Sequence, residues 1–474
     1  MTAVNLVTER QLLARSKTSS RATSSRRRLL FVLLAFAHAM ACRLIQDQVL
    51  AQSGVFEYMG LRWMPANLGV ELLFLALAVA PALLFIPVEL KRASDLLLII
   101  VYGTVYVPAT ALFPNVTLND TGEALLLTGV CLFGLYLTTR LAQFEPGGGG
   151  SGFGLPDNRY DLMLFCAAGA VIASYVAFVP IQVVEFDLTR VYEFRAAFGD
   201  QMSKLSPLML YVFVNAALAL SPMMIVRGLT RKNYLMVALA FGLAFYTFAV
   251  TSYRSLLFVA GFVAALTYLI RLKIPPAVSI FGFFVAVAAG TVALDAMAHA
   301  AIPTNTFSIH YRLFGNSATI TSAYLDLFSS HQKFYYSQSF LRFLIRPPTD
   351  IPYPLLVGHE ISTVENVWAN GNMVADAFAN LGYAGVFLSF VALGLFLALF
   401  NWVSQAKDRM VAALTLAAPG FYLSNGGLQS AVLSGGLGVT VLLVVLYPTT
   451  NLSFVSRHPT PEPAGPAPEG QDEG

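Results

Sequence analysis

The sequence predicts an all-α, polytopic integral membrane protein with about twelve transmembrane helices, and three observations support this fold class. The 474 residues are 57% hydrophobic and only 12% charged, with a mean hydropathy of +0.66, whereas an average soluble domain carries about twice that charged share. The apolar residues gather in runs of roughly 20, the length that spans a bilayer as a helix. Lys and Arg recur in every second connection between those runs.

Twelve apolar runs are candidate spans, and each is expected to be helical because a helix satisfies its own backbone polar groups in lipid. Their approximate bounds are 29–49, 66–87, 95–113, 122–140, 161–180, 207–226, 234–252, 255–272, 275–295, 381–403, 409–424 and 428–447. The first run is interrupted by Arg43, Gln46 and Asp47, and Gly and Ser near residues 424–438 weaken the last two.

The basic residues predict the orientation of the spans. With the N-terminus in the cytoplasm, every inner connection is basic, whereas the facing connection 114–123 contains no Lys or Arg. The inner residues are Lys91, Arg92, Arg140, Arg159, Arg227, Arg231, Lys232, Arg271, Lys273, Lys407 and Arg409. Twelve spans with both termini inside therefore agree with the charge pattern.

Three polar segments are expected on the cytoplasmic side. Residues 1–28 form a basic tail without a clear signal-peptide cleavage site. Residues 145–158 form a Gly-rich flexible linker that lacks the Lys-Ser/Thr of a phosphate loop. Residues 448–474 are rich in Pro, Gly and Glu, a composition typical of disorder.

Several function classes are disfavoured by composition and by absent motifs. The net charge is +3, and Lys and Arg are spread among the loops, so we expect no nucleic-acid partner. Cys42, Cys131 and Cys166 lie in apolar runs without disulfide or metal-ligand spacing. The chain contains no DxD, HExxH or GxSxG motif. We therefore expect no metal and no cofactor.

Two long connections fall on the outer side and divide the spans into groups of five (29–180), four (207–295) and three (381–447). These are a first outer loop, 181–206, and a second outer loop, 296–380. Arginines stand among aromatic residues in these loops and in one short outer turn. The candidates are Arg195, Arg254, Arg312, Arg342 and Arg346.

Guanidinium groups bind phosphate oxygens bidentately and stay charged, so these arginines are candidate ligands for a lipid-linked pyrophosphate. The alternative is that they reach lipid headgroups or pair with nearby carboxylates. Arg342 and Arg346 would share one face if their segment were helical, and Pro347–Pro348 would end that helix.

The second outer loop also holds candidate acid–base groups. His359 and Glu360 are adjacent, and either could take a proton from a sugar hydroxyl, with His310 as a rival. The alternative is that a loop histidine is simply solvated. Three dispersed histidines do not have the spacing of a metal site.

The stretch NVWANGNMVADAFANLGY places Asn372, Asp376 and Asn380 at intervals of four, directly before a span. If residues 368–380 are helical, these groups form one polar stripe on an amphipathic helix that enters the membrane from outside. The stripe could bind sugar hydroxyls in a cavity. It could instead cap and orient the helix, with Gly382 and Gly385 permitting close packing.

Three motifs resemble the Wzy-type polymerases of bacterial O-antigens and related exopolysaccharides. They are VTSYRSLLF, IHYRLFGN and NVWANGNMVADAFANLGYAGV, which together cover about 40 residues. The many spans and two unequal outer loops are also similar to that family. Some members carry an Arg followed eleven residues later by Gly in both outer loops, and neither loop here shows that spacing.

The resemblance implies a GT-C-like membrane glycosyltransferase of the bacterial inner membrane, with its active site facing the periplasm. It would transfer a growing glycan from undecaprenyl pyrophosphate to a lipid-linked repeat unit, next to a flippase and a chain-length regulator in cell-envelope biosynthesis. Under this reading the arginines hold pyrophosphate, His359 or Glu360 activates the acceptor hydroxyl, and the Asn/Asp stripe binds sugar.

Two alternatives stay open. An O-antigen ligase shares the layout but passes the finished glycan to another acceptor. A flippase or transporter would perform no chemistry; transporters place charges near broken helices at mid-membrane, whereas the predicted span interiors here are almost free of charge.

Overall fold

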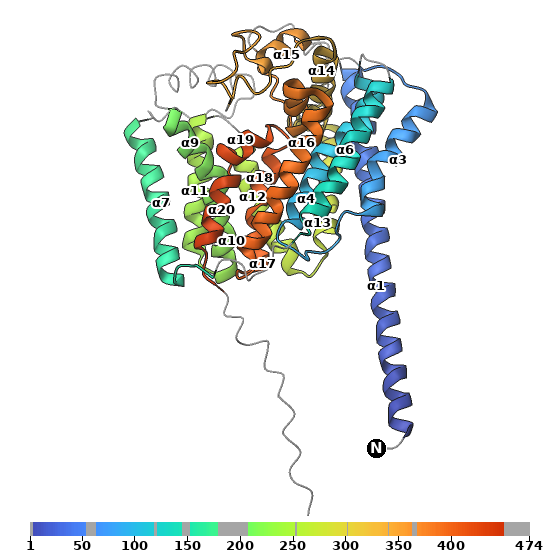
Figure 1. Cartoon of the computed structure of the whole chain (residues 1–474), viewed down its shortest axis with the longest axis vertical. Helices are drawn as coiled ribbons and strands as arrows, with labels where there is room; N and C mark the ends of the chain where they lie inside the picture. The colour runs from blue at the N-terminus through green and yellow to red at the C-terminus, as the bar shows by residue number, and fades with distance from the viewer. Residues whose placement is uncertain are drawn as a thin grey trace, which may run out of the picture.

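The computed structural model is a bundle of helices (Figure 1). It describes residues 3–53, 63–117, 121–144, 152–178, 207–251, 254–300, 302–339, 341–362 and 367–449, and within these ranges there is no strand. In Figure 1 the start of helix α1 and the end of helix α20 both lie toward the lower end of the bundle. Helices α14 and α15 lie at the opposite end. We call these the terminal end and the loop end.

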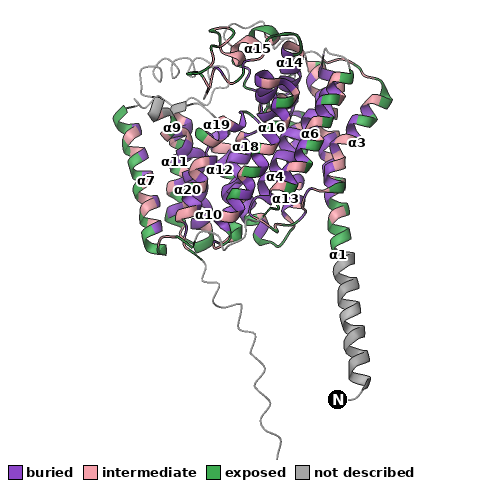
Figure 2. Ribbon diagram, in the orientation of Figure 1, coloured by how far each residue is buried: buried purple, intermediate pink, exposed green. Residues whose placement is uncertain are grey.

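Among the residues that the structure describes, eight helical stretches are long and apolar enough to cross a membrane, so the prediction of a polytopic, all-helical membrane protein is confirmed. They are Ser24–Ser53, Asp95–Val116, Thr121–Leu141, Asp157–Phe178, Tyr211–Arg231, Pro276–Met297, Met373–Ser404 and Leu428–Leu446. Each overlaps one predicted run. Many of their large apolar side chains are exposed, as expected of helices that face lipid (Figure 2).

The remaining four predicted runs hold shorter helices. Three of them are α3 (Leu68–Leu84), α11 (Tyr234–Thr251) and α12 (Arg254–Arg271). The run 409–424 is divided between α17 (Arg409–Thr415) and α18 (Ala417–Tyr422). A helix therefore occupies every predicted run, and the count of twelve crossings stays a prediction.

The eight stretches contain further elements. These are α1 (Ala3–Leu44), η1 (Ile45–Leu50), η2 (Ala51–Ser53), α4 (Asp95–Val101), η3 (Tyr102–Tyr106), α5 (Val107–Val116), α6 (Thr121–Leu141), α7 (Asp157–Phe178), α9 (Pro207–Asn215), η4 (Ala216–Leu220), α10 (Ser221–Arg231), α13 (Pro276–Met297), α16 (Met373–Ser404), α19 (Leu428–Leu433) and α20 (Leu437–Leu446). Four elements, η1, η3, η4 and the later η5, are π-helical. Such distortions are rare and often lie at functional sites.

The second predicted outer loop is mostly ordered and partly buried. Element η5 (Thr306–Gly315) continues into α14 (Asn316–Ser330), which packs against α5 and α16, and α15 (Tyr353–Ile361) follows. The predicted first outer loop 181–206 and most of the tail 448–474 lie outside the described residues, as do residues 145–151 of the linker. Helix α1 begins at Ala3, so one helix continues from the predicted basic tail 1–28 into the first span, and the boundary at residue 28 stays a prediction.

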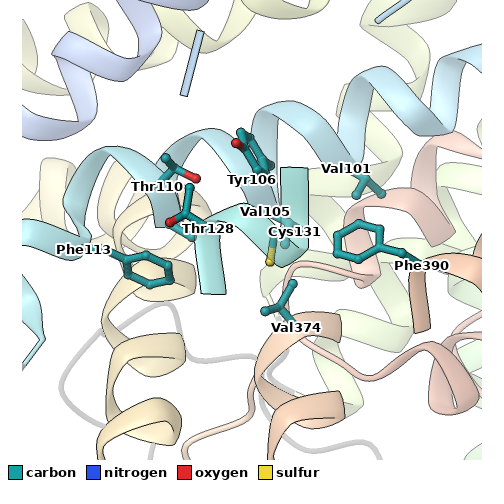
Figure 3. Close-up of a pocket in the computed structure, with 10 residues that line it drawn as sticks. Val101, Val105, Tyr106, Thr110, Phe113, Thr128, Cys131, Val374 and Phe390 are labelled. Atoms are coloured by element: carbon teal, nitrogen blue, oxygen red, sulfur yellow. The ribbon is translucent and has the colours of Figure 1, made fainter. Parts of the chain in front are cut away.

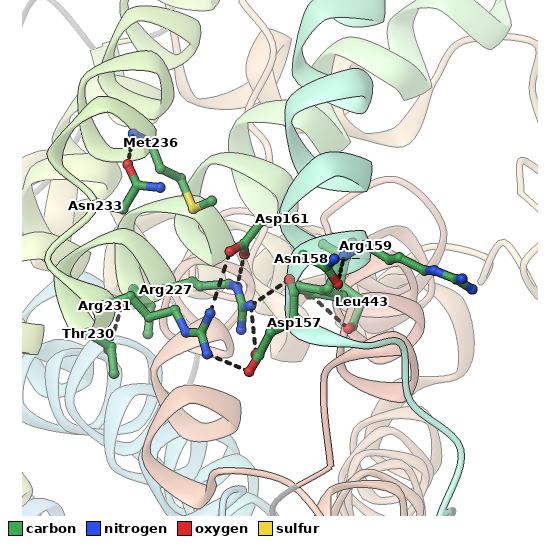
Figure 4. A network of polar contacts seen from close by, with 12 residues as sticks. Asp157, Asn158, Arg159, Asp161, Arg227, Thr230, Arg231, Asn233, Met236 and Leu443 are labelled. Carbon is green, nitrogen blue, oxygen red and sulfur yellow. Dashed lines mark hydrogen bonds and ion pairs between the residues drawn. The ribbon is translucent and has the colours of Figure 1, made fainter.

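A group of ion pairs, which we call the Arg227 cluster, joins α7 and α10 at the terminal end (Figure 4). The Arg227 guanidinium pairs with Asp161 and lies 3.1 Å from an Asp157 carboxylate oxygen; Arg231 is 2.6 Å from the other oxygen of Asp157. The guanidinium also lies 4.9 Å from the ring centre of Tyr160. This buried cation is therefore surrounded by acceptors and an aromatic face.

Candidate functional site

The polar stripe predicted at residues 372–380 lies on a short helix that turns back on the span following it. Helix α16 has non-helical angles at Gly382 (φ 62°, ψ −146°), a region almost restricted to glycine. Val374 and Phe390 line one small cavity (Figure 3), although 16 residues of straight helix would separate them by about 24 Å. The chain therefore reverses at Gly382. We call residues 373–381 the half-helix; it begins inside the bundle and not at residue 368.

The half-helix begins at a buried cap. The Asn372 side-chain oxygen accepts hydrogen bonds from the amides of Val374 (2.9 Å) and Ala375 (3.0 Å), the usual role of Asn before a first turn. Its amide nitrogen donates to Ser317 Oγ (2.7 Å) and Thr321 Oγ1 (2.8 Å) on α14. Of the two roles considered for Asn372, sugar binding and helix capping, the structure shows helix capping.

Asp376 lies one turn further along and is only 6% exposed. Tyr353 Oη donates to Oδ1 at 2.5 Å, and Gln429 Nε2 donates to Oδ2 at 2.7 Å. Gly427 lies against the same carboxylate, and a Cβ there would collide with it. We call Asp376, Tyr353 and Gln429 the Asp376 cluster. Within the described part of the chain, no Lys or Arg forms an ion pair with this carboxylate.

Tyr353 opens α15, so the Asp376 cluster connects three distant parts of the sequence at the loop end. Burial, and then the nearby negative charge of Asp376, raise the pKa of Tyr353 far above its ordinary value. The phenol is therefore a permanent hydrogen-bond donor to Asp376. The same two causes, in the same order, raise the pKa of the nearby Tyr336 to about 12.

The C-terminal end of the half-helix is held by the segment after α14. Asn380 donates to the carbonyl of Asp376 (2.8 Å), and its side-chain oxygen accepts from the amide of Tyr336 (2.7 Å). The amides of Phe334 and Tyr335 donate to the carbonyls of Ala379 and Asn380, both at 3.0 Å. The outer segment therefore satisfies the carbonyls that a helix end leaves free.

The other predicted site residues are not gathered around Asp376 by any contact that the structure describes. Arg312 is exposed and lies 5.7 Å from the Phe307 ring centre. Arg342 and Arg346 are exposed in a series of turns, so the helical face expected for them is absent. Arg195 lies outside the described residues. Arg254 opens α12, but the position of its side chain is not described.

His359 and Glu360 are exposed on the last turn of α15. Their helix is connected to the half-helix at its other end, through Tyr353. His310, the rival candidate, is buried in η5, and neither of its ring nitrogens has a hydrogen-bond partner. Burial, and then the neighbouring His38, lower the pKa of His310 to about 3. His310 is therefore neutral at physiological pH.

The cavity drawn in Figure 3 is too small for a sugar. It is lined almost wholly by apolar side chains, including Val101, Phe113 and Phe390, and its volume is about 10 Å³. A space of this size admits about one water molecule. The described residues also contain no group of three or more His, Cys, Asp or Glu side chains that could hold a metal ion.

Tyr353, Gln429 and Gly427 were not expected from the sequence. The only signal for the last two was the Gly- and Ser-rich composition near 424–438, which made the final two spans weak. That weakness has a structural cause, because α18 ends at Tyr422 and α19 begins at Leu428 inside the bundle. The amide of Met373 donates to the carbonyl of Leu423 (3.0 Å) in this break.

The arrangement places a buried carboxylate between neutral donors, where an interrupted helix and a half-helix meet. Ionisable groups within membrane bundles are costly to bury and commonly functional. A carboxylate with such donors can exchange one of them for a hydroxyl of a ligand without separating an ion pair. No family model matches the chain, and comparison with curated proteins and with solved structures gives no match either.

Proposed function

We propose that the protein is a membrane glycosyltransferase that polymerises oligosaccharide repeat units carried on undecaprenyl pyrophosphate. The observation that carries the proposal is the Asp376 cluster, a buried carboxylate held by hydroxyl and amide donors beneath a segment that exposes arginines. The three motifs similar to Wzy-type polymerases support the same function. On this proposal the loop end faces the periplasm of a bacterial inner membrane.

The proposed reaction needs no nucleotide and no metal. A hydroxyl oxygen of the lipid-linked acceptor forms a bond to the anomeric carbon of the donor glycan. The bond between that carbon and pyrophosphate breaks, and undecaprenyl pyrophosphate leaves. His359 or Glu360 takes the hydroxyl proton, while the candidate arginines neutralise the leaving charge. They are Arg195, Arg254, Arg312, Arg342 and Arg346.

The half-helix is assigned to sugar recognition in this scheme. Asn372 and Asn380 already hold backbone and side-chain partners, so they keep the half-helix in place. Asp376 is different, because both of its oxygens are held by side-chain donors, which a sugar hydroxyl can replace. Asp376 is thus the group on the half-helix that we propose contacts substrate.

A transporter or flippase for the same lipid-linked glycan is the second candidate. A half-helix beside an interrupted helix is typical of transporter binding sites, and both features occur here. This observation favours the transporter more than the sequence did.

Deleting the gene and sizing the lipid-linked and surface glycans would separate the candidates. If the protein is a polymerase, the deletion strain should contain single repeat units on the outer face of the membrane in place of long chains. Long chains that remain on undecaprenyl pyrophosphate would indicate a ligase. Repeat units confined to the cytoplasmic face would indicate a flippase, and the proposed chemistry would then be wrong. Complementation with Arg312→Ala and His359→Ala variants then tests the assigned roles.

A further inference from the structure

A loop between α14 and α15 has a fixed base and an exposed apolar tip. Gln338 closes the base, since its Nε2 donates to the carbonyls of Thr349 (3.1 Å) and Ile351 (2.8 Å). Its Oε1 accepts from the amide of Tyr353 (3.0 Å), the residue that also bonds Asp376. One glutamine therefore ties both ends of the loop to the site at the loop end of the bundle. Compact loops with closed ends of this kind are frequently functional.

The tip of this loop exposes large apolar side chains outside every candidate span. Phe343 is 81% exposed and Leu344 is 71% exposed. Leu84 at the end of the apolar helix α3 is 68% exposed, so the two tip residues are at least as open as this exposed leucine of an apolar helix. Two adjacent apolar groups held in water on an ordered loop are unfavourable, and such a patch normally marks an interaction surface.

The charges beside the tip indicate its partner. Arg342 and Arg346 flank Phe343 and Leu344 in sequence, and both are exposed. Apolar side chains between arginines match the boundary between acyl chains and phosphate headgroups. The loop is also continuous with a bundle that spans a membrane, so this boundary is close to the loop end. A soluble partner would have to supply both an apolar pocket and anions.

We propose that Phe343 and Leu344 insert into the outer leaflet of the membrane that the protein spans, with Arg342 and Arg346 at the depth of the lipid phosphates. The loop is then an anchor that fixes the outer segment against the bilayer. Because Gln338 and Tyr353 connect this anchor to Asp376, the depth of the loop sets the depth of the cluster. The proposal does not depend on the proposed function, since a transporter would use the same anchor.

The test uses the full chain in nanodiscs of phosphatidylcholine and phosphatidylglycerol. Cys42, Cys131 and Cys166 are replaced by Ala, and a spin label is attached to Phe343→Cys. Collision rates with oxygen, which enters the bilayer, and with a water-soluble nickel chelate then report the depth of the label. Matched references are Leu388→Cys, exposed on α16, and Glu360→Cys, exposed on α15.

We expect the label at residue 343 to resemble the one at 388, with oxygen collisions favoured severalfold over those of the label at 360. Adding Gln338→Ala should then broaden the depth distribution, because the base of the loop is released. A label at 343 that meets the nickel chelate as freely as the label at 360 would overturn the proposal. Protection from both reagents would indicate a protein partner or a second copy, and would overturn it as well.

Discussion

The Arg227 cluster and the Asp376 cluster each bury one charged group, but they stabilise it differently. Arg227 is 1% exposed and has two carboxylate partners, which are themselves 22% and 52% exposed. Asp376 is 6% exposed and has only a phenol and an amide. The first cluster is an ion-pair network whose acidic members reach water. The second is a buried carboxyl group held by neutral dipoles, with no opposite charge paired to it in the described part of the chain to offset the cost of its burial.

This difference indicates that the two clusters have different roles, one in helix packing and the other in the proposed ligand binding. An ion-pair network of this kind connects α7 to α10, and its buried cation already has two carboxylate partners, although one guanidinium nitrogen of Arg227 has no hydrogen-bond partner among the described residues. A carboxylate held by neutral donors offers two strong acceptor positions to any hydroxyl that can displace them. Substitutions in each cluster test this difference.

The largest effect is expected at the Arg227 cluster. Arg227→Met removes the cation between Asp157 and Asp161 and the contact with Tyr160. Breaking a buried pair costs roughly 3–5 kcal/mol. We expect about 2–4 kcal/mol here, because both carboxylates can regain water. Denaturant titration in mixed micelles measures the loss.

Arg231→Met is the matched control for that change, since Arg231 pairs with the same two carboxylates but is half exposed. An exposed pair contributes about 1 kcal/mol or less. Equal losses from the two variants would mean that burial of Arg227 adds nothing, and the contrast between the clusters would fail.

Gly427→Ala is expected to have the next largest effect. The new methyl group would overlap the Asp376 carboxylate, which cannot move without leaving Tyr353 and Gln429. Overpacking of this kind costs about 1–3 kcal/mol. Gly290→Ala on α13 is the control, because a Cβ there meets no atom within 4 Å. Stability of the two variants is compared by the same titration; a Gly427 variant as stable as the control contradicts the packing.

Tyr353→Phe removes one of the two donors to Asp376 while keeping the ring. A hydrogen bond to a charged group contributes about 1.5–3 kcal/mol, and we expect a loss at the lower end of that range because Gln429 remains. On the proposed function, polymer length in complemented cells should also fall, since α15 loses its connection to the half-helix. Unchanged stability together with unchanged polymer would show that this bond is not formed in the membrane.

The smallest effect on stability is expected for Asp376→Asn. The change in the free energy of unfolding should differ between this variant and the corresponding variant of the Arg227 cluster, Asp161→Asn. Removing a charge that has only neutral partners should change the free energy of unfolding by less than about 1 kcal/mol, whereas Asp161→Asn should lower it by weakening a pair with Arg227. On the proposed function, activity should behave in the opposite way, with polymer lost in the Asp376 variant and kept in the Asp161 variant. An Asp376 variant that makes full-length polymer would remove this residue from the site.

The sequence predicted the positions of the helices well because burial in lipid is a strong, local signal. Every predicted run holds helix, from Ser24–Ser53 to Leu428–Leu446. The stripe of Asn372, Asp376 and Asn380 was also found, because its spacing of four is that of a helix face. What the spacing could not reveal is the reversal at Gly382, since a single glycine before a span reads equally well as a packing residue.

Partners contributed by distant segments could not be predicted either. Tyr353 and Gln429 lie 23 and 53 residues from Asp376 in sequence, and no periodic pattern connects them. Their meeting depends on the break between α18 and α19, which the sequence showed only as a weakness in hydropathy. The arginines and His359 were selected by chemistry alone, and their part in the site stays a prediction.

The position of the half-helix has a consequence for biogenesis. Its first turn is bonded to Ser317 and Thr321, which are synthesised earlier, and to Leu423 and Gln429, which are synthesised later. The predicted spans 409–424 and 428–447 are synthesised last. Until they are made, the half-helix lacks its partners Leu423 and Gln429. A chain that stops after Asp408 would carry ten of the twelve predicted spans and still lack a donor to Asp376. The hydrogen bonds that hold the half-helix are therefore complete only when the last two predicted spans have been synthesised.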